Sequence, residues 1–386
     1  MLVEISNAPR DYAWGSRTLI ATLQGRRASG EPEAEVWFGD HPGSPAAVAD
    51  GSGRALSDVL AISPAAPAHL PFLLKLLAAA SPLSIQVHPT KDQAMAGFAR
   101  EEAARVALDA SERNYRDDNA KPEILVAVSE TFEALSGLRP IEATLRLVDG
   151  LGDGGRALAA RLSGGDAETA LRNTIAWLVS PEAHAEVDDI IAAAVEASTD
   201  PRAEFAGDLA VTRRLAAAYP GDPGVVVGML MNHVVLERGE ALYNRAGSLH
   251  AYLDGLGVEL MTASDNVLRG GLTPKHVDAA ELLRVLDPTP GPPALIAPTQ
   301  LAPRVDVFDV GVSDFALVRV RCRSDEATVV PLRGPAIALV IEGTVEMATT
   351  DAAATLSPGR AAFAVAADAL TVTGDGLVYI AEPGSG

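Results

Sequence analysis

The sequence predicts a mainly β protein that is interrupted by a helical segment. Residues 1–140 hold short, strand-like apolar runs between Gly and Pro turns, whereas residues 141–219 show only helical periodicity. From about residue 225 the strand-like runs return. We therefore expect residues 1–140 and 225–288 to form one discontinuous β domain around a helical domain, 141–224, and residues 289–386 to form a second β domain.

In the first β region, four runs read as strands: "AEVWFG", "PFLLKLL", "LSIQV" and "EILVAV". The third extends from Leu83 to His88 and stops at Pro89. Because successive side chains on a strand point to opposite faces, Ser84, Gln86 and His88 share one face. Residues 90–112 are rich in helix formers and predict a helix with Thr90 as its N-cap.

The helical segment is predicted from apolar residues at helical spacing. "SPEAHAEVDDIIAAAVEAS" opens with Ser180 as a cap and Pro181 in the first turn. "YPGDPG", residues 219–224, ends the segment with strong helix breakers. The two predicted apolar stripes are Leu171, Ile175 and Leu178, followed by Val187, Ile190, Ile191 and Ala194.

The second β region begins with "HVVLERGEALYNRAGSLHAYLDGLGVELM", which predicts strands of four to six residues separated by Gly-containing turns. A short helix is expected in "TPKHVDAAELLRVL", with Thr273 as the cap and Pro274 in the first position. "DPTPGPPALIAP" then reads as a Pro-rich linker. The many short strands predicted over 305–386 favour a sandwich or jelly roll.

Composition limits the class of protein. Hydrophobic residues make up 48% of the 386 residues, which allows a sizeable core. The formal net charge of −20 disfavours a nucleic-acid partner, which needs a basic footprint. The single Cys322 excludes an intrachain disulfide and fits a reducing compartment. No signal-peptide pattern or bilayer-length apolar run is present, so we expect a cytoplasmic protein without a membrane partner.

A metal site would have to be assembled from distant segments. None of the seven histidines lies in an HxxxH or HExxH motif. The candidate ligands by context are Gln86, His88, Glu123 and His250, a mostly N/O set that suits Zn²⁺. A single histidine beside a strand is most often a hydrogen-bonded structural residue, so spacing alone leaves both interpretations open.

A second group of functional candidates lies in "VELMTASDNVLRGGLTPKH", residues 258–276. Glu259 stands opposite in strand phase to its apolar neighbours, and Asp265, Arg269 and Lys275 follow beside two glycines. This stretch could hold a phosphate or a sugar, since the planar fork of an arginine binds phosphate bidentately. A solvated, salt-bridged loop is the alternative.

Five motifs together resemble the type I phosphomannose isomerase family: "YAWGS", "AEVWFGDHPGSP", "PFLLKLLAAASPLSIQVHPTKDQA", "DDNAKPEILVAV" and "AGSLHAYLDGLGVELMTASDNVLRGGLTPKH". They run in family order from about residue 11 to 286, whereas the last hundred residues match only as a β domain in the right place. The resemblance implies a catalytic cupin jelly roll interrupted by a helical domain and followed by a second jelly roll. That last domain contains no histidine and is expected to lack a metal site.

The resemblance also implies a zinc enzyme that interconverts mannose 6-phosphate and fructose 6-phosphate through a cis-enediol, in carbohydrate metabolism and GDP-mannose supply. It assigns one zinc per chain and a monomer. The zinc ligands would be Gln86, His88, Glu123 and His250; the active-site arginine Arg269; the phosphate-side contacts Ser84 and Lys275; and the pocket residues Lys121 and Tyr252. For the base, Glu259 is favoured over Asp265 and Lys121 because a partly buried carboxylate has a suitable pKa.

Two positions depart from the family pattern. "AKPE" has Ala120 where many members have His, so any proton transfer by that histidine must fall to another group or to water. "LYNRAGSLH" has Arg245 where Pro is common, which puts the local turn in doubt. A non-catalytic cupin-fold phosphosugar-binding regulator is the alternative from another class. An iron-dependent cupin oxygenase is less favoured, because it would require a His-rich facial set of ligands.

Overall fold

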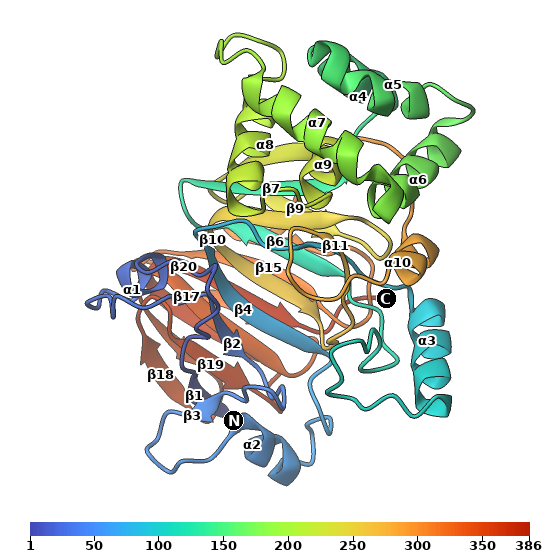
Figure 1. Ribbon diagram of the computed structural model, residues 1–386. Coiled ribbons are helices and arrows are strands. Elements are labelled where there is room, and N and C mark those ends of the chain that lie inside the picture. The colour runs from blue at the N-terminus through green and yellow to red at the C-terminus, as the bar shows by residue number, and fades with distance from the viewer.

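The computed structural model describes residues 1–386 as two ten-stranded antiparallel sheets with a layer of helices on one side (Figure 1). The mainly β prediction is confirmed. The first sheet comprises β2 (Glu35–Phe38), β4 (Phe72–Ala79), β5 (Ile85–Val87), β6 (Glu123–Ala127), β7 (Thr131–Leu138), β8 (Met231–Glu237), β9 (Ala241–Asn244), β10 (His250–Thr262), β11 (Leu268–Gly271) and β12 (Leu295–Ile296).

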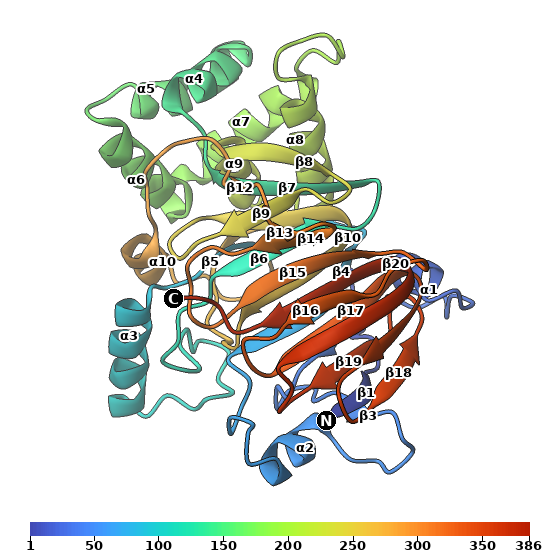
Figure 2. The same ribbon diagram turned by 180° about the vertical axis from the view of Figure 1, so that it is seen from behind.

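The second sheet carries most of the C-terminal strands. It comprises β1 (Leu2–Ser6), β3 (Ala47–Val48), β13 (Thr299–Ala302), β14 (Val305–Phe308), β15 (Ala316–Cys322), β16 (Thr328–Pro331), β17 (Ala336–Ala348), β18 (Ala353–Leu356), β19 (Ala361–Ala364) and β20 (Ala369–Glu382). The reverse view shows this sheet in front (Figure 2). Because β1 pairs antiparallel with β19, the two ends of the chain lie in one sheet. The division of the sheets therefore does not follow the order of the chain.

A shared apolar core joins the two sheets. It contains Val36, Leu76 and Val258 from the first sheet together with Leu339 and Phe363 from the second, all almost fully buried. Alternation along each strand places these side chains on the inner face. The opposite face of the first sheet carries a second apolar cluster that includes Leu77 and Leu125, and beside it the charged residues Glu35, Lys75 and Glu259 line a cavity.

Strand β10 organises the first sheet, and it corrects one prediction. It runs for 13 residues instead of four to six, passing through Gly255 and Gly257 without a turn. Gly255 has φ +119°, and a Cβ there would lie 2.9 Å from Phe132 Cα. The register shift in β10 lies earlier, between Tyr252 and Asp254, so these two glycines serve close contact between strands.

The helical segment is confirmed over 141–219. It comprises α4 (Ile141–Asp149), α5 (Arg156–Leu162), α6 (Ala167–Leu178), α7 (His184–Glu196), α8 (Ala206–Ala218) and α9 (Gly224–Met229), with 3₁₀ turns at Gly152–Gly155 and Pro181–Ala183. Leu171 and Ile175 are fully buried, as the spacing predicts. Helix α9 runs past residue 224, so the second β region starts at Met231. No helix is both long and apolar enough to span a bilayer.

Two of the other helices differ from prediction. Helix α3 (Lys91–Ala103) begins as expected, with the Thr90 side chain accepting from Gln93 N, but it ends well before residue 112. Arg105 there has φ +57°, a left-handed conformation that a helix cannot contain. Thr273 is not a cap. Helix α10 (Ala279–Val285) is capped by Asp278, and Thr273 accepts a hydrogen bond from Lys275 N in a loop. Helices α1 (Leu19–Leu23) and α2 (Leu56–Ile62) are short and peripheral.

Candidate metal centre and anion pocket

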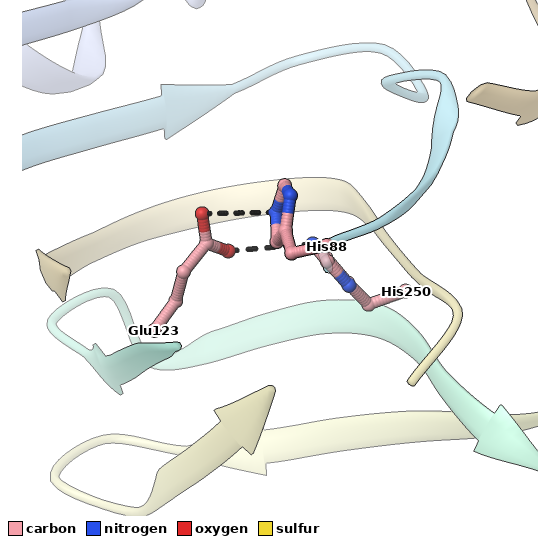
Figure 3. A group of neighbouring side chains, drawn as sticks. All are labelled: His88, Glu123 and His250. Atoms are coloured by element: carbon pink, nitrogen blue, oxygen red, sulfur yellow. Dashed lines mark ion pairs between the residues drawn. The ribbon is translucent and has the colours of Figure 1, made fainter. Parts of the chain in front are cut away.

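His88, Glu123 and His250 converge in the first sheet, where their ligating atoms lie within 4.8 Å of one another (Figure 3). His88 follows β5, Glu123 begins β6 and His250 begins β10. Antiparallel pairing sets His250 opposite Gln86 and Met261 opposite Glu123, so neighbouring strands bring the three segments together. All three side chains are buried.

The histidines present unprotonated nitrogens to the carboxylate. His88 Nδ1 lies 2.8 Å from Asn266 O, and His250 Nδ1 lies 3.1 Å from Ser248 O. A carbonyl can only accept, so each Nδ1 carries the proton and each Nε2 keeps a lone pair. These Nε2 atoms lie 3.2 and 3.3 Å from the two oxygens of Glu123. The buried Nε2 of His88 has no hydrogen-bond partner.

This donor set fits a metal ion. Lone pairs that face a carboxylate repel it unless a cation lies between them. Burial and the neighbouring Lys121 lower the pKa of His88 to about 4, so the imidazole is neutral at pH 7. Burial opposes ionisation of Glu123, but the positive charge of Lys121 acts against it, and the pKa of that carboxyl lies well below its usual range. Two neutral imidazoles and one carboxylate match the ligands of zinc sites.

A small cavity of about 60 Å³ adjoins this group, and it brings most of the predicted residues together. Glu123 and His250 line it, and the wider lining includes Gln86, Ser84, Lys121, Tyr252 and Glu259. Gln86 therefore faces the same space as the buried group.

Glu259 lies on a buried charge network that the sequence did not predict. It sits opposite Lys75 across β10 and β4, and Lys75 Nζ lies 2.9 Å from Glu259 Oε2. Lys75 Nζ also lies 3.9 Å from Glu35 Oε1. Burial raises the pKa of Glu259 while Lys75 opposes the rise. Lys75 and Glu35 are each a charge among apolar neighbours in "PFLLKLL" and "AEVWFG", which is the signal that could have identified them.

A larger cavity of about 640 Å³ shares Glu35, Lys75, Ser84, Gln86 and Lys121 with the small one. Its volume falls within the range of small-molecule sites, about 300–1,000 Å³. Arg116, Arg269 and Lys275 line it. Burial lowers the pKa of Lys275, and the charges of Arg269 and Arg116 lower it further. None of these three cations forms an ion pair with a carboxylate, although the chain has a net charge of −20.

Asp265 lines the larger cavity but lies apart from the small one. Its Oδ2 lies 3.2 Å from His41 Nε2, and its amide donates to Asp117 Oδ2. The sequence did not predict Arg116 or His41 as site residues, because each is a common residue type in a polar loop and gives no periodic signal.

The two departures have structural partners. Arg245 Nη1 lies 2.5 Å from Asp287 Oδ2, and the adjacent Gly247 amide donates to the His88 carbonyl at 2.8 Å. The turn before His250 is thus held without the proline. Ala120 leaves no imidazole beside Lys121, and His41 is the histidine that lines the larger cavity.

Fold and site together define a class of protein: a mainly antiparallel β protein with a buried His–Glu–His group beside a small cavity that adjoins a larger pocket lined by three unpaired cations. Comparison with known sequences identifies the family within that class. The model of the phosphomannose isomerase type I catalytic domain matches residues 2–141. Mannose-6-phosphate isomerase of Escherichia coli (strain K12) is 35% identical, covering 97% of both chains. The Homo sapiens enzyme of the same name is 30% identical, covering 89% of this chain and 88% of its own.

Solved structures agree with the sequence comparison. Mannose 6-phosphate isomerase from Salmonella typhimurium bound to fructose 6-phosphate and zinc has a TM-score of 0.90 and 32% identity, covering 99% of both chains. The apo form of that enzyme has a TM-score of 0.89 at 32% identity, again with 99% coverage of both chains. The chain belongs to the type I phosphomannose isomerase family, and it is therefore an isomerase.

Proposed function

We propose that this chain is a zinc-dependent aldose–ketose isomerase that interconverts mannose 6-phosphate and fructose 6-phosphate through a cis-enediol. The main support for this proposal is a set of cations without carboxylate partners in a pocket that adjoins the His–Glu–His group. These cations are Arg116, Arg269 and Lys275. A phosphate dianion would compensate these charges, and its sugar would then reach toward the buried group.

The metal would be held by Gln86, His88, Glu123 and His250, one ion per chain. When bound, zinc supplies the Lewis acidity that stabilises negative charge on the sugar oxygens. The two backbone carbonyls at Nδ1 of the histidines orient the rings for that task. The chain's own residues supply the proton transfer and hold the phosphate.

Glu259 is the proposed base. Its buried carboxylate would take the proton from carbon 2 of the aldose, and the C–H electron pair would form the double bond of the enediol as the carbonyl oxygen gains a proton. Return of a proton to carbon 1, with loss of the carbon-2 hydroxyl proton, gives the ketose. Lys75, 2.9 Å from Glu259, keeps this carboxylate in place. Asp265 and Lys121 are the rival groups.

The remaining residues hold and shape the substrate. Arg269 and Lys275 would bind phosphate with Ser84, and Arg269 could also neutralise the enediolate. Burial and the nearby Glu259 raise the pKa of Tyr252 well above its usual value, so its hydroxyl stays protonated and can donate to a sugar oxygen. Phosphate binding at a distance from the reacting carbons fixes the register of the substrate.

We propose that the sheets are cupin jelly rolls, with residues 1–140 and 225–288 forming the catalytic domain, 141–224 the helical domain and 289–386 a domain without a metal site. Strand β1 would then be an arm exchanged into the last domain, since it pairs with β19. We further propose a monomer that acts in the cytoplasm; gel filtration with light scattering checks the first of these.

A coupled assay of mannose 6-phosphate isomerisation tests the function. The protein as purified, after chelation, and after re-addition of zinc should give activity, loss and recovery in that order. A protein that holds zinc and shows no turnover would favour the non-catalytic phosphosugar-binding regulator. Binding of mannose 6-phosphate by calorimetry would then identify that second function.

A further inference from the structure

A turn on the wall of the larger cavity has an unusual backbone. Gly271 has φ +127°, and Leu272, a buried branched residue, has φ +55°. A non-glycine residue in the left-handed region costs on the order of 1–3 kcal/mol and persists only where its surroundings hold it. The turn leads directly from Arg269 to Lys275.

One carboxylate from the helical segment holds this turn. Asp222 lies in "YPGDPG", outside every motif that identifies the family. Its Oδ1 accepts from Leu272 N at 3.0 Å and from Gly224 N at 2.7 Å, and its Oδ2 accepts from Thr273 N at 3.1 Å. Hydrogen bonds from backbone N–H groups to a carboxylate are about twice as strong as neutral ones.

The contact between the two segments is close enough to exclude side chains. A Cβ on Gly271 would lie 2.5 Å from Gly224 Cα, and a Cβ on Gly224 would lie 2.4 Å from Leu272 N. The start of α9 therefore rests directly on the turn. Tyr219, just before it, donates its hydroxyl to Pro82 O at 2.9 Å and also lines the cavity.

We propose that Asp222 is a positioning residue for the phosphate of the substrate. By fixing the left-handed turn at Leu272, it sets the distance and direction of Lys275 relative to Arg269 across the cavity. The helical segment thereby completes the anion pocket, although none of its own cations enters the pocket. This inference rests on the proposed function only in naming the phosphosugar as the anion.

Two variants test it, with inorganic phosphate and mannose 6-phosphate as the probes. In Asp222→Asn, Oδ1 can keep the bonds to Leu272 and Gly224, while the amide that replaces Oδ2 cannot accept from Thr273 N. Asp222→Ala removes all three bonds. Loss of these hydrogen bonds to the turn should raise the KM of mannose 6-phosphate and the Kd of phosphate about tenfold. We expect kcat to change less than about threefold, since the reacting carbons are held elsewhere.

In Asp222→Asn, the loss of negative charge and the loss of the hydrogen bond are expected to change phosphate affinity in opposite directions. Removing an anion near a phosphate site should by itself tighten phosphate binding. Asp153→Asn, an exposed acid of the same helical segment, is the matched control and should leave KM and Kd unchanged. Unchanged or tighter phosphate binding in folded Asp222→Asn overturns the proposal, as does a fall in kcat with unchanged Kd.

Calorimetry with phosphate separates this inference from the proposed function. If wild-type protein binds phosphate without turnover, the isomerase proposal fails while Asp222 is still tested by Kd. If Asp222→Ala does not fold, Asp222→Asn decides, because it preserves two of the three bonds.

Discussion

At the scale of single residues, the chemistry depends on where protons are held. His88 and His250 each donate from Nδ1 to a backbone carbonyl, which leaves each Nε2 with a lone pair directed at Glu123. A protonated His88 would lose that capacity, and burial prevents protonation by lowering its pKa to about 4. The backbone thus sets the ligand character of both side chains.

His88→Ala should lose both zinc and isomerase activity, because it removes a nitrogen ligand from the buried group. Metal content by atomic emission and the coupled assay measure the two effects. His184→Ala, at an exposed position at the start of α7, should retain both. A fully active, zinc-free His88→Ala protein would falsify the metal site.

Glu259→Gln should leave zinc bound and lower kcat by about two decades or more, the usual scale for loss of a general base. Glutamine keeps an oxygen for Lys75, so the buried lysine does not lose its hydrogen-bond acceptor. Steady-state kinetics with a zinc measurement decide the matter. If kcat survives while KM alone rises, Glu259 is a binding residue and Asp265 or Lys121 becomes the base.

At the scale of elements, strand β10 spans the whole site. It begins with His250, passes Tyr252 and carries Glu259 nine positions after the ligand. A straight strand rises about 3.3 Å per residue and would separate these two side chains by roughly 30 Å. His250 and Glu259 nevertheless line the same small cavity, and the bulge between Tyr252 and Asp254 is the irregularity that bends β10 between them. A turn inside β10, as the glycines suggested, would have uncoupled them.

Gly255→Ala should therefore disturb both stability and the site. An alanine would need the positive φ of Gly255 and would place a Cβ 2.9 Å from Phe132 Cα, at an expected cost of about 1–3 kcal/mol. Urea unfolding measures the loss, and the coupled assay reports any displacement of Glu259. Gly164→Ala, where an added Cβ meets nothing within 4 Å, should be nearly neutral. Equal stability of the two variants would contradict the role assigned to Gly255.

At the scale of the whole molecule, the shared core makes the two sheets interdependent. Residues of the N-terminal strand and of the C-terminal strands lie in one apolar cluster with the strands that carry the site. The last segment contributes side chains such as Leu339 and Phe363 to this cluster. We expect global unfolding to report on groups buried in the metal centre.

The metal-free protein should lose stability on mild acidification. Burial lowers the pKa of His88 to about 4, whereas an unfolded histidine titrates near about 6.5. Between these values only the unfolded chain binds the proton, so the free energy of unfolding falls as the pH falls through this window. His88 alone contributes up to about 3 kcal/mol. Urea unfolding at several pH values measures the slope, and His88→Gln should show a shallower one. Parallel slopes would contradict this.

The sequence by itself determined the order of β, helical and β segments and named the three residues that converge in the candidate metal centre. Apolar periodicity is local, so 141–219 could be read as helical, and Thr90 as a cap, from neighbouring residues alone. The candidate ligands His88, Glu123 and His250 were found because each stands at a strand end within a recognisable motif.

Only the tertiary structure decided which groups surround those ligands. Lys75 meets Glu259 through strand register, Arg116 joins Arg269 and Lys275 across a cavity, and Asp222 reaches Leu272 from 50 positions earlier. It also decided that β1 pairs with β19, and that Gly255 lies within a strand and Thr273 in a loop. These contacts join residues far apart in the chain, and local periodicity carries no information about such pairs.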